Sequence, residues 1–373
     1  MGNVEWEIKT LLDLSVSIED GDWIEKKDQS TSGIRLIQTG NVGQGCYKDK
    51  GEKAKYISED TFIRLRCTEL TTGDILVSRL PEPVGRACIL PALGVRCITA
   101  VDCSIIKLKQ DIIYPQWFVY YSLSSEYAAK VKKECSGTTR DRISRKKLSC
   151  ITVPVPPLSE QQRIVDILDA EFAKIDALKE NAEKNLQNAK DLFCKCLKRE
   201  FEGQGTTLGS VLNLRRGHDL THNEMVKGDI PVAGSGGIIG FHNSSTPISP
   251  CITVGRSGSV GKVFIYETCW AHNTVLYVDD FKGNNPFYLT YLLMSMDLSK
   301  KQSGCGVPTL NRNYLHPMII GFNHNVYEQA EIVANLNNLH KNSLALESNY
   351  EKIISLCGDL KQALLRKAFN GEL

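Results

Sequence analysis

A stretch of about 44 residues that occurs twice constrains the fold of this chain more than any other sequence feature. Glu160-Gln161 recurs 168 positions later as Glu328-Gln329, and Phe201-Glu202-Gly203 recurs at the same offset as Phe369-Asn370-Gly371. Two unrelated amphipathic helices could share a spacing by chance. An ungapped frame with both ends aligned favours internal duplication, so we expect two similar halves.

The first copy has the sequence signals of one long helix. Pro156 and Pro157 favour extended backbone ahead of it, and Ser159 with Gln162 forms a capping-box pattern at its start. Neither proline nor glycine follows until Gly203, which predicts a helix of about 43 residues, roughly 65 Å long. A helix of that length indicates a coiled coil or a spacer rather than part of one globular core.

Both copies also carry the apolar spacing of a coiled coil. Alternating steps of four and three residues fall mainly on apolar side chains in each copy. The predicted contact positions are Ile164, Leu168, Ile175, Leu178 and Leu192 in the first copy, and Ile332, Leu336, Leu339, Leu346, Ile353, Leu360 and Leu364 in the second. Glu171 and Asn185 interrupt the first series, and as polar seam positions they are expected to fix its register. The second copy lacks the prolines, but Asn325 and Glu328 can still cap its helix.

The segments outside these helices have the patterns of mixed α+β domains. Short apolar runs separated by glycines, such as Ile34–Ile37 and Ser104–Leu108, indicate strands, whereas Glu7–Leu14 and Trp117–Val131 indicate helices. We therefore predict two tandem globular domains and two long helices, with bounds 1–157, 158–203, 204–325 and 326–373. If a pseudo-two-fold axis relates the halves, the two long helices run antiparallel.

Composition argues against several classes of protein. The apolar fraction of 42% is that of a soluble globular chain, and the sequence has neither an apolar signal core nor an apolar run of about 18 residues. We therefore expect a cytoplasmic protein that does not enter a membrane. The 13 cysteines include no CxxC pair and the seven histidines show no HExxH spacing, so no metal site is predicted.

The net charge of +2 neither demands nor excludes nucleic acid, but the charge is unevenly distributed. Between Lys130 and Lys147 the chain carries eight basic residues against only Glu134 and Asp141. This local excess indicates a surface that faces phosphates. An ordinary solvated face would have the same composition, so that alternative stays open.

Three stretches resemble catalytic motifs, but each departs from its pattern. Gly255–Lys262 resembles a phosphate loop, yet its spacer has five residues instead of four, and valine follows the lysine. Val232–Gly236 resembles the glycine-rich turn of S-adenosylmethionine enzymes, and Asn284–Phe287 resembles the Asn-Pro-Pro-aromatic signature of amino-methyltransferases with Asn at its second position. No run of alternating parallel strands and helices surrounds either stretch. We therefore predict no catalytic residue in this chain.

Two similar globular domains and a spacer favour a protein that binds a two-part target, and duplex DNA fits that description. The basic residues beside glycine turns in both halves are the first candidates for contacts with DNA. The predicted DNA-binding residues are Arg79, Arg86, Arg256 and Lys262, and, after the matched Ser136-Gly137 and Ser303-Gly304, Arg140, Arg142, Arg145, Lys146 and Arg312. Ordinary solvated charge is the alternative for each of them.

Four motifs together resemble the specificity subunits of type I restriction–modification systems: Pro156–Ile164, Gly234–Gly240, Val254–Val263 and Leu364–Gly371. The resemblance covers the whole chain and implies two target-recognition domains separated by two antiparallel helices. It also implies partners: double-stranded DNA, two modification subunits that bind the helices and methylate adenine N6, and restriction subunits that complete an endonuclease. S-adenosylmethionine, ATP and magnesium would then be bound by those partners, and this chain would need no cofactor.

Two other classes of function stay open from the sequence. The first is a self-contained DNA amino-methyltransferase, which would bind its cofactor as an isolated chain. The second is a coiled-coil scaffold without DNA specificity, which would give no footprint on DNA and a shallow dependence of binding on salt.

Overall fold

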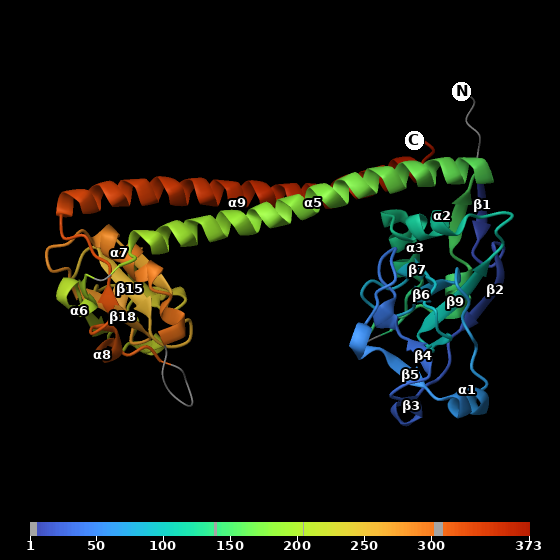
Figure 1. The fold of residues 1–373 in the computed structure, drawn as a ribbon, viewed down its shortest axis with the longest axis horizontal. Helices are drawn as coiled ribbons and strands as arrows, with labels where there is room; N and C mark the ends of the chain where they lie inside the picture. Colours follow the sequence, from blue (N-terminus) through green and yellow to red (C-terminus); the bar gives the residue numbers. More distant parts are fainter. Residues whose placement is uncertain (1–5, 138–139, 204, 302–308) are drawn as a thin grey trace. The chain divides into compact units, whose positions relative to one another are not determined.

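The computed structural model describes residues 6–137, 140–203, 205–301 and 309–373, and the chain divides into two compact units (Figure 1). Unit 1 comprises Met1–Glu180 with Ile354–Leu373, and unit 2 comprises Asn181–Ile353. Each unit therefore contains one globular part together with a segment of both long helices.

Unit 1 is a mixed α+β unit. In chain order its globular elements are β1 (Glu7–Thr10), β2 (Ser15–Asp20), β3 (Gln29–Ser30), β4 (Ile34–Ile37), β5 (Lys55–Ile57), α1 (Glu59–Leu65), β6 (Ile75–Ser78), β7 (Ala87–Ile89), β8 (Cys97–Thr99), β9 (Cys103–Leu108), α2 (Pro115–Ser122), α3 (Ser125–Glu134), α4 (Arg145–Ser149) and β10 (Thr152–Val155). The sheets have the strand orders β2-β9-β6-β7, β3-β5-β4-β8 and β1-β10. Among the described strands of unit 1, all pairs are antiparallel except β4 with β8.

Unit 2 repeats this architecture. Its globular elements are β11 (Thr206–Thr207), α6 (Leu208–Val211), β12 (Asn213–Arg216), β13 (Ile230–Gly234), β14 (Gly237–His242), β15 (Cys251–Gly255), β16 (Val263–Tyr266), β17 (Trp270–Ala271), β18 (Val275–Asp280), α7 (Pro286–Ser295), α8 (Arg312–Leu315) and β19 (Ile319–Ile320). The strand orders are β12-β18-β15-β16, β14-β13-β17 and β11-β19. The parallel pair of unit 2, β13 with β17, corresponds to β4 with β8.

Two predicted helices of unit 1 differ from the structure. Glu7–Leu14 was expected to be helical, but β1 pairs with β10 in register from Glu7↔Val155 to Thr10↔Thr152, and a turn follows. The segment Trp117–Val131 forms two helices, because the Ser124 side chain accepts the Tyr127 N–H and caps a new helix, α3.

Backbone hydrogen bonds repeat between the two units and confirm the duplicated order of elements. The Arg79 N–H donates to the Asp102 carbonyl at 2.9 Å, and the Arg256 N–H donates to the Thr274 carbonyl at 2.8 Å. Three further bonds of unit 1 each have a counterpart in unit 2. The Gly21 N–H donates to the Cys103 carbonyl as Gly217 does to Val275, and the Asp22 N–H donates to Thr99 as His218 does to Ala271. The Ile143 N–H donates to Arg79 as Leu310 does to Arg256. These bonds define equivalent positions without reference to side chains.

Both predicted long helices are present. Helix α5 runs from Leu158 to Glu200 and α9 from Val326 to Phe369, with 43 and 44 residues. Because α5 begins at Leu158, Ser159 lies within its first turn and is not the N-cap. At α9 the predicted cap is confirmed, since the Asn325 side chain accepts the Tyr327 N–H at 3.1 Å and donates to Glu328 at 2.8 Å.

The helices run antiparallel within each unit. In unit 1 the Lys361 Nζ lies 4.7 Å from the centroid of the Phe172 ring, and Arg163 binds the carbonyl of Leu373 at 2.6 Å. In unit 2 the Phe193 ring stacks on His340 at 4.6 Å. Phe172 and His340 are 168 residues apart, as are Phe193 and Lys361, so the same two seam positions meet in each unit.

The predicted phase of the seam was wrong at every second position. From Leu168 the contacts step by four to Phe172 and then by three to Ile175, whereas steps of three and then four were expected. The predicted seam residues Leu178, Leu192, Leu346 and Leu360 are therefore 44–53% exposed. The other predicted positions are buried or half-buried: Leu168, Ile175, Leu336, Ile353 and Leu364, and also Ile164, Ile332 and Leu339. The last three pack on the core of their own unit. Glu171 and Asn185 also lie beside the seam, and Glu171 pairs with Lys174 at 2.8 Å.

A buried glutamine fastens each long helix to its own globular part. The Gln161 amide oxygen accepts the Tyr114 N–H at 2.8 Å, and its Nε2 donates to the carbonyls of Ile112 and Pro156. Its equivalent, Gln329, accepts the Asn285 N–H at 2.8 Å, and its Nε2 donates to the Asn284 side chain and the Asn323 carbonyl. Both glutamines are fully buried, so each one satisfies backbone groups that water does not reach.

We expect Gln329→Ala to destabilise unit 2 by about 1–3 kcal/mol, because the Asn285 N–H and two acceptors lose their partner. Hydrogen exchange by mass spectrometry on the full chain should show faster exchange in peptides of α7 and little change in unit 1. Gln162→Ala is the matched control, since Gln162 is exposed and its side chain donates to Asp166, one turn further along the same helix. Equal exchange in the two variants would contradict the assigned role of Gln329.

Candidate nucleic-acid interface

In each unit four loops converge at one edge of the long antiparallel sheet. In unit 1 they follow β2, join β6 to β7, join β8 to β9, and precede α4; the repeated backbone bonds place the same four loops together in unit 2. We call these sites the loop edges. The loop edge of unit 1 carries Asp20, Asp22, Arg79, Asp102, Arg142 and Arg145, and the equivalent positions in unit 2 carry Arg216, His218, Arg256, Thr274, Thr309 and Arg312.

Arg86 was predicted to contact DNA, but the structure gives it a structural role. It is 9% exposed, and its guanidinium donates to four backbone carbonyls, those of Thr39, Val42, Leu80 and Pro83, at 2.7–2.9 Å. Burial lowers the pKa of this group. Because four of its five N–H donors are used inside the unit and the side chain is buried, Arg86 orders the β6–β7 loop and does not present its guanidinium to a phosphate.

Arg79 is also buried, at 4% exposure, and it anchors the loop edge from behind. Its guanidinium donates to the Val101 carbonyl and lies 3.4 Å from the Asp20 carboxylate. Burial lowers its pKa, an effect that Asp20 opposes. Arg79 was predicted to contact DNA, but because it is buried it supports the loop edge from inside the unit.

Arg142 and Arg145 are exposed, and two aspartates of the loop edge hold them. Arg142 lies 3.0 Å from the Asp102 carboxylate, and Arg145 lies 3.9 Å from Asp20. The structure thus brings together predicted residues that come from different loops. Arg140 and Lys146 are exposed as well, and within the described part of the chain neither has an ion pair.

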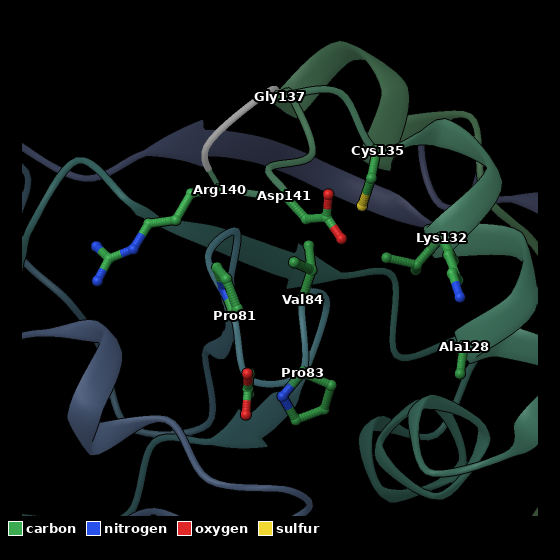
Figure 2. A pocket seen from close by; sticks show the side chains of 11 residues that line it. Pro81, Pro83, Val84, Ala128, Lys132, Cys135, Gly137, Arg140 and Asp141 are labelled. Atoms are coloured by element: carbon green, nitrogen blue, oxygen red, sulfur yellow. The ribbon is translucent and has the colours of Figure 1, made fainter. Parts of the chain in front are cut away.

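A cavity of about 780 Å³ lies between the β6–β7 loop and the end of α3 (Figure 2). Pro83 and Val84 line one side, and Figure 2 shows Cys135 and Asp141 pointing toward them from the other. The lining mixes apolar surface with cations and carboxylates. None of its described lining residues is a histidine.

In unit 2 the predicted cations are more accessible than Arg79 and Arg86. Arg256 is half-buried and Lys262, at the position equivalent to Arg86, is exposed; neither has an ion pair among the described residues. Arg312 is exposed and donates to the Leu214 carbonyl at 3.3 Å. The matched Ser303-Gly304 lies outside the described residues.

Sequence reasoning missed a basic pocket in unit 1. A cavity of about 240 Å³ is lined by Arg35, Lys50, Lys53 and Lys55 together with uncharged residues, among them Leu36 and Gln38. Arg35 pairs with Asp49 at 2.5 Å, while the three lysines are exposed. Because Asp49 and Glu52 alternate with these lysines, the segment looked like an ordinary solvated loop in the sequence.

A second group that was missed lies at the loop edge of unit 2. Asp219 accepts hydrogen bonds from the Arg216 guanidinium at 3.0 Å and from the Asn273 side-chain amide at 2.5 Å. These two donors, Asn273 first, lower the pKa of the Asp219 carboxyl. The spacing Arg-x-x-Asp is too common in sequences to single this group out.

The catalytic-looking motifs take structural positions. Gly255–Lys262 joins two antiparallel strands, β15 and β16, and does not lead from a strand into a helix as a phosphate loop does. Gly234–Gly237 forms the β13–β14 hairpin. Asn285 caps α7 by accepting the N–H groups of Phe287 and Tyr288, and Asn284 bonds Gln329.

Within the part of the chain that the structure describes, no helix is long and apolar enough to span a membrane. No group of three or more histidine, cysteine or acidic side chains there is arranged to hold a metal ion.

The family model described as "Type I restriction modification DNA specificity domain" matches residues 3–188 and 204–355. The EcoKI specificity subunit of Escherichia coli (strain K12) is 21% identical over 345 residues, which cover 75% of this chain and 70% of that protein. The MjaVIII specificity subunit of Methanocaldococcus jannaschii is 26% identical over 190 residues, or 50% of this chain and 44% of that protein.

Solved structures share the fold. A chain from a study of assembly and conformational transition in the type I R-M system has a TM-score of 0.80 at 16% identity, with 99% of each chain covered. The HsdS subunit from Thermoanaerobacter tengcongensis has a TM-score of 0.63 at 15% identity, covering 99% of this chain and 98% of that chain.

The chain therefore belongs to the type I restriction–modification DNA specificity family. It is a specificity subunit, and its function is recognition of the DNA target.

We expect Arg86→Ala to destabilise unit 1 by about 3 kcal/mol, because four buried carbonyls lose their donor. Thermal unfolding of the full chain should show the loss. The matched control is Lys262→Ala at the equivalent, exposed position of unit 2, which should leave the unfolding temperature within about a degree. A stable Arg86→Ala protein with weakened DNA binding would instead restore Arg86 as a DNA contact.

Proposed function

We propose that this specificity subunit recognises a bipartite and asymmetric stretch of duplex DNA, with one half-site for each unit. The observation that supports this most directly is the repeated framework: the same backbone hydrogen bonds hold both loop edges, while the polar side chains on them differ. Equal frameworks present equivalent positions to DNA, and different side chains there select different bases. Two half-sites of unlike sequence follow.

Exposed and half-buried cations supply the contacts that do not depend on sequence. Arg140 and Lys146 in unit 1, and Arg256 and Lys262 in unit 2, have no ion pair among the described residues. The lysines of the basic pocket add three more charges in unit 1. Lysine and arginine side chains of this kind neutralise phosphates and fix the register of the protein on the duplex.

Exposed leucines on the long helices support docking of two copies of one partner. Leu178 and Leu346 are 50% and 44% exposed and lie 168 residues apart; Leu192 and Leu360 are 53% and 48% exposed at the same offset. Each unit therefore offers one leucine of each type. Two modification subunits of the methyltransferase would bury these side chains, and restriction subunits would join the assembly.

The chemistry of the assembly belongs to those partners in this proposal, and this chain is not catalytic by itself. S-adenosylmethionine, ATP and magnesium would be bound by the partner subunits. The modification subunits would flip the target adenine and methylate its N6 atom. Support comes from the catalytic-looking motifs of this chain, whose described residues cap a helix or form turns.

Exchange of residues 206–325 for the corresponding domain of another family member tests the modular arrangement. We expect one half of the methylated motif to change and the other half, with the spacing between them, to persist, because the second globular part alone would read the second half-site. Sequencing of methylated DNA from cells that carry the complex measures this. If both halves changed, the assignment of one half-site to each unit would be wrong.

A further inference from the structure

The two loop edges have one framework but differ in charge, which is balanced in unit 1 and positive at the equivalent positions of unit 2. In unit 1 three aspartates stand beside three arginines, whereas the equivalent positions of unit 2 carry three arginines and no carboxylate. Asp20 is replaced by Arg216, and Asp102 by Thr274. Differences confined to polar side chains on a constant backbone are what two readers of unlike sequences require.

At the loop edge of unit 2 one carboxylate orients an exposed arginine. Asp219 holds the Arg216 guanidinium at 3.0 Å and is itself held by Asn273 at 2.5 Å. Arg216 ends β12, and Asn273 lies in the β17–β18 loop, so two separate elements fix the pair. The side chain of Arg216 is still 53% exposed, which leaves guanidinium donors for a ligand.

The loop edge of unit 1 carries a similar pair, built from other positions. Asp102 holds Arg142 at 3.0 Å, and the arginine side chain is 47% exposed. The equivalents of these residues in unit 2 are Thr274 and Thr309, which cannot form an ion pair. An oriented arginine thus arises separately in each unit, at the same edge but from different sequence positions.

Such a pair suits a base better than a phosphate. An arginine–carboxylate pair has no net charge as a unit, so it adds little to the release of counterions that drives phosphate binding. An exposed ion pair also contributes little to stability. What the pair does provide is a planar fork of donors with a restricted orientation, and that fork matches the O6 and N7 acceptors of guanine in the major groove.

We propose that Arg142 and Arg216 are specificity-determining residues that each read a guanine in the half-site of their own unit, with Asp102 and Asp219 as positioning residues. The proposal rests on the proposed function above, since it assigns base contacts within each half-site. The unpaired cations Arg256 and Lys262 contact phosphates beside the same loop edge.

Arg216→Lys in the assembled methyltransferase complex tests the proposal. Lysine keeps the charge but not the fork, so discrimination should fall about ten- to a hundredfold at one base pair of the second half-site. The first half-site and the salt dependence of binding should stay unchanged. Asp219→Asn should relax the same base pair, and Arg142→Lys should relax one base pair of the first half-site only.

Two measurements separate the outcomes: sequencing of methylated sites, and DNA affinity of the complex as a function of salt. The matched control is Lys262→Ala, which should lower the slope of log K against log salt by about one and leave the motif unchanged. Unchanged discrimination in folded Arg216→Lys, or equal weakening on all sequences, would overturn the proposal. If the wild-type complex methylates no bipartite motif, the proposed function fails first, and that result is visible before any variant is compared.

Discussion

The structure depends on one buried side chain at the start of each long helix. Gln161 and Gln329 bond backbone groups that lie just ahead of α2 and α7 and just ahead of their own helices, so each helix and its globular part share one hydrogen-bond network. Aromatic contacts complete the junction in unit 1, where Phe369 from the end of α9 packs on Trp117 with ring centroids 4.8 Å apart. In this way the helices are components of both cores and not merely connections between them.

Duplication explains why so much of this arrangement was predictable from the sequence. The recurrence of Glu-Gln at an offset of 168 marked the two glutamines. The absence of proline and glycine before Gly203 gave the length of α5, and the repeat gave that of α9 in spite of Gly358. The phase of the seam was not predictable, because leucines occupy both candidate series and the choice depends on where Phe172 and Phe193 pack. Burial of Arg86 was hidden for a similar reason: two of its acceptors, Thr39 and Val42, lie more than 40 residues away in the chain.

The same contrast between framework and surface accounts for function. Backbone bonds and buried groups repeat from one unit to the other, and they could be inferred from repetition alone. The loop edges differ in the side chains that they carry, such as Asp20 in unit 1 and Arg216 in unit 2. Because these residues do not repeat, the duplication could not be used to predict which of them face DNA. Under the proposed function, a specificity subunit would change its target by changing its loop edges while both cores remain intact.

The most direct test of this account is transfer of a labelled methyl group from S-adenosylmethionine to duplex DNA. The purified chain should be compared with the complex that it forms with its modification subunits. The account predicts no transfer by the chain alone, and transfer by the complex to adenines within a single bipartite motif. Transfer by the chain alone, or by the complex at sites that share no motif, would contradict it.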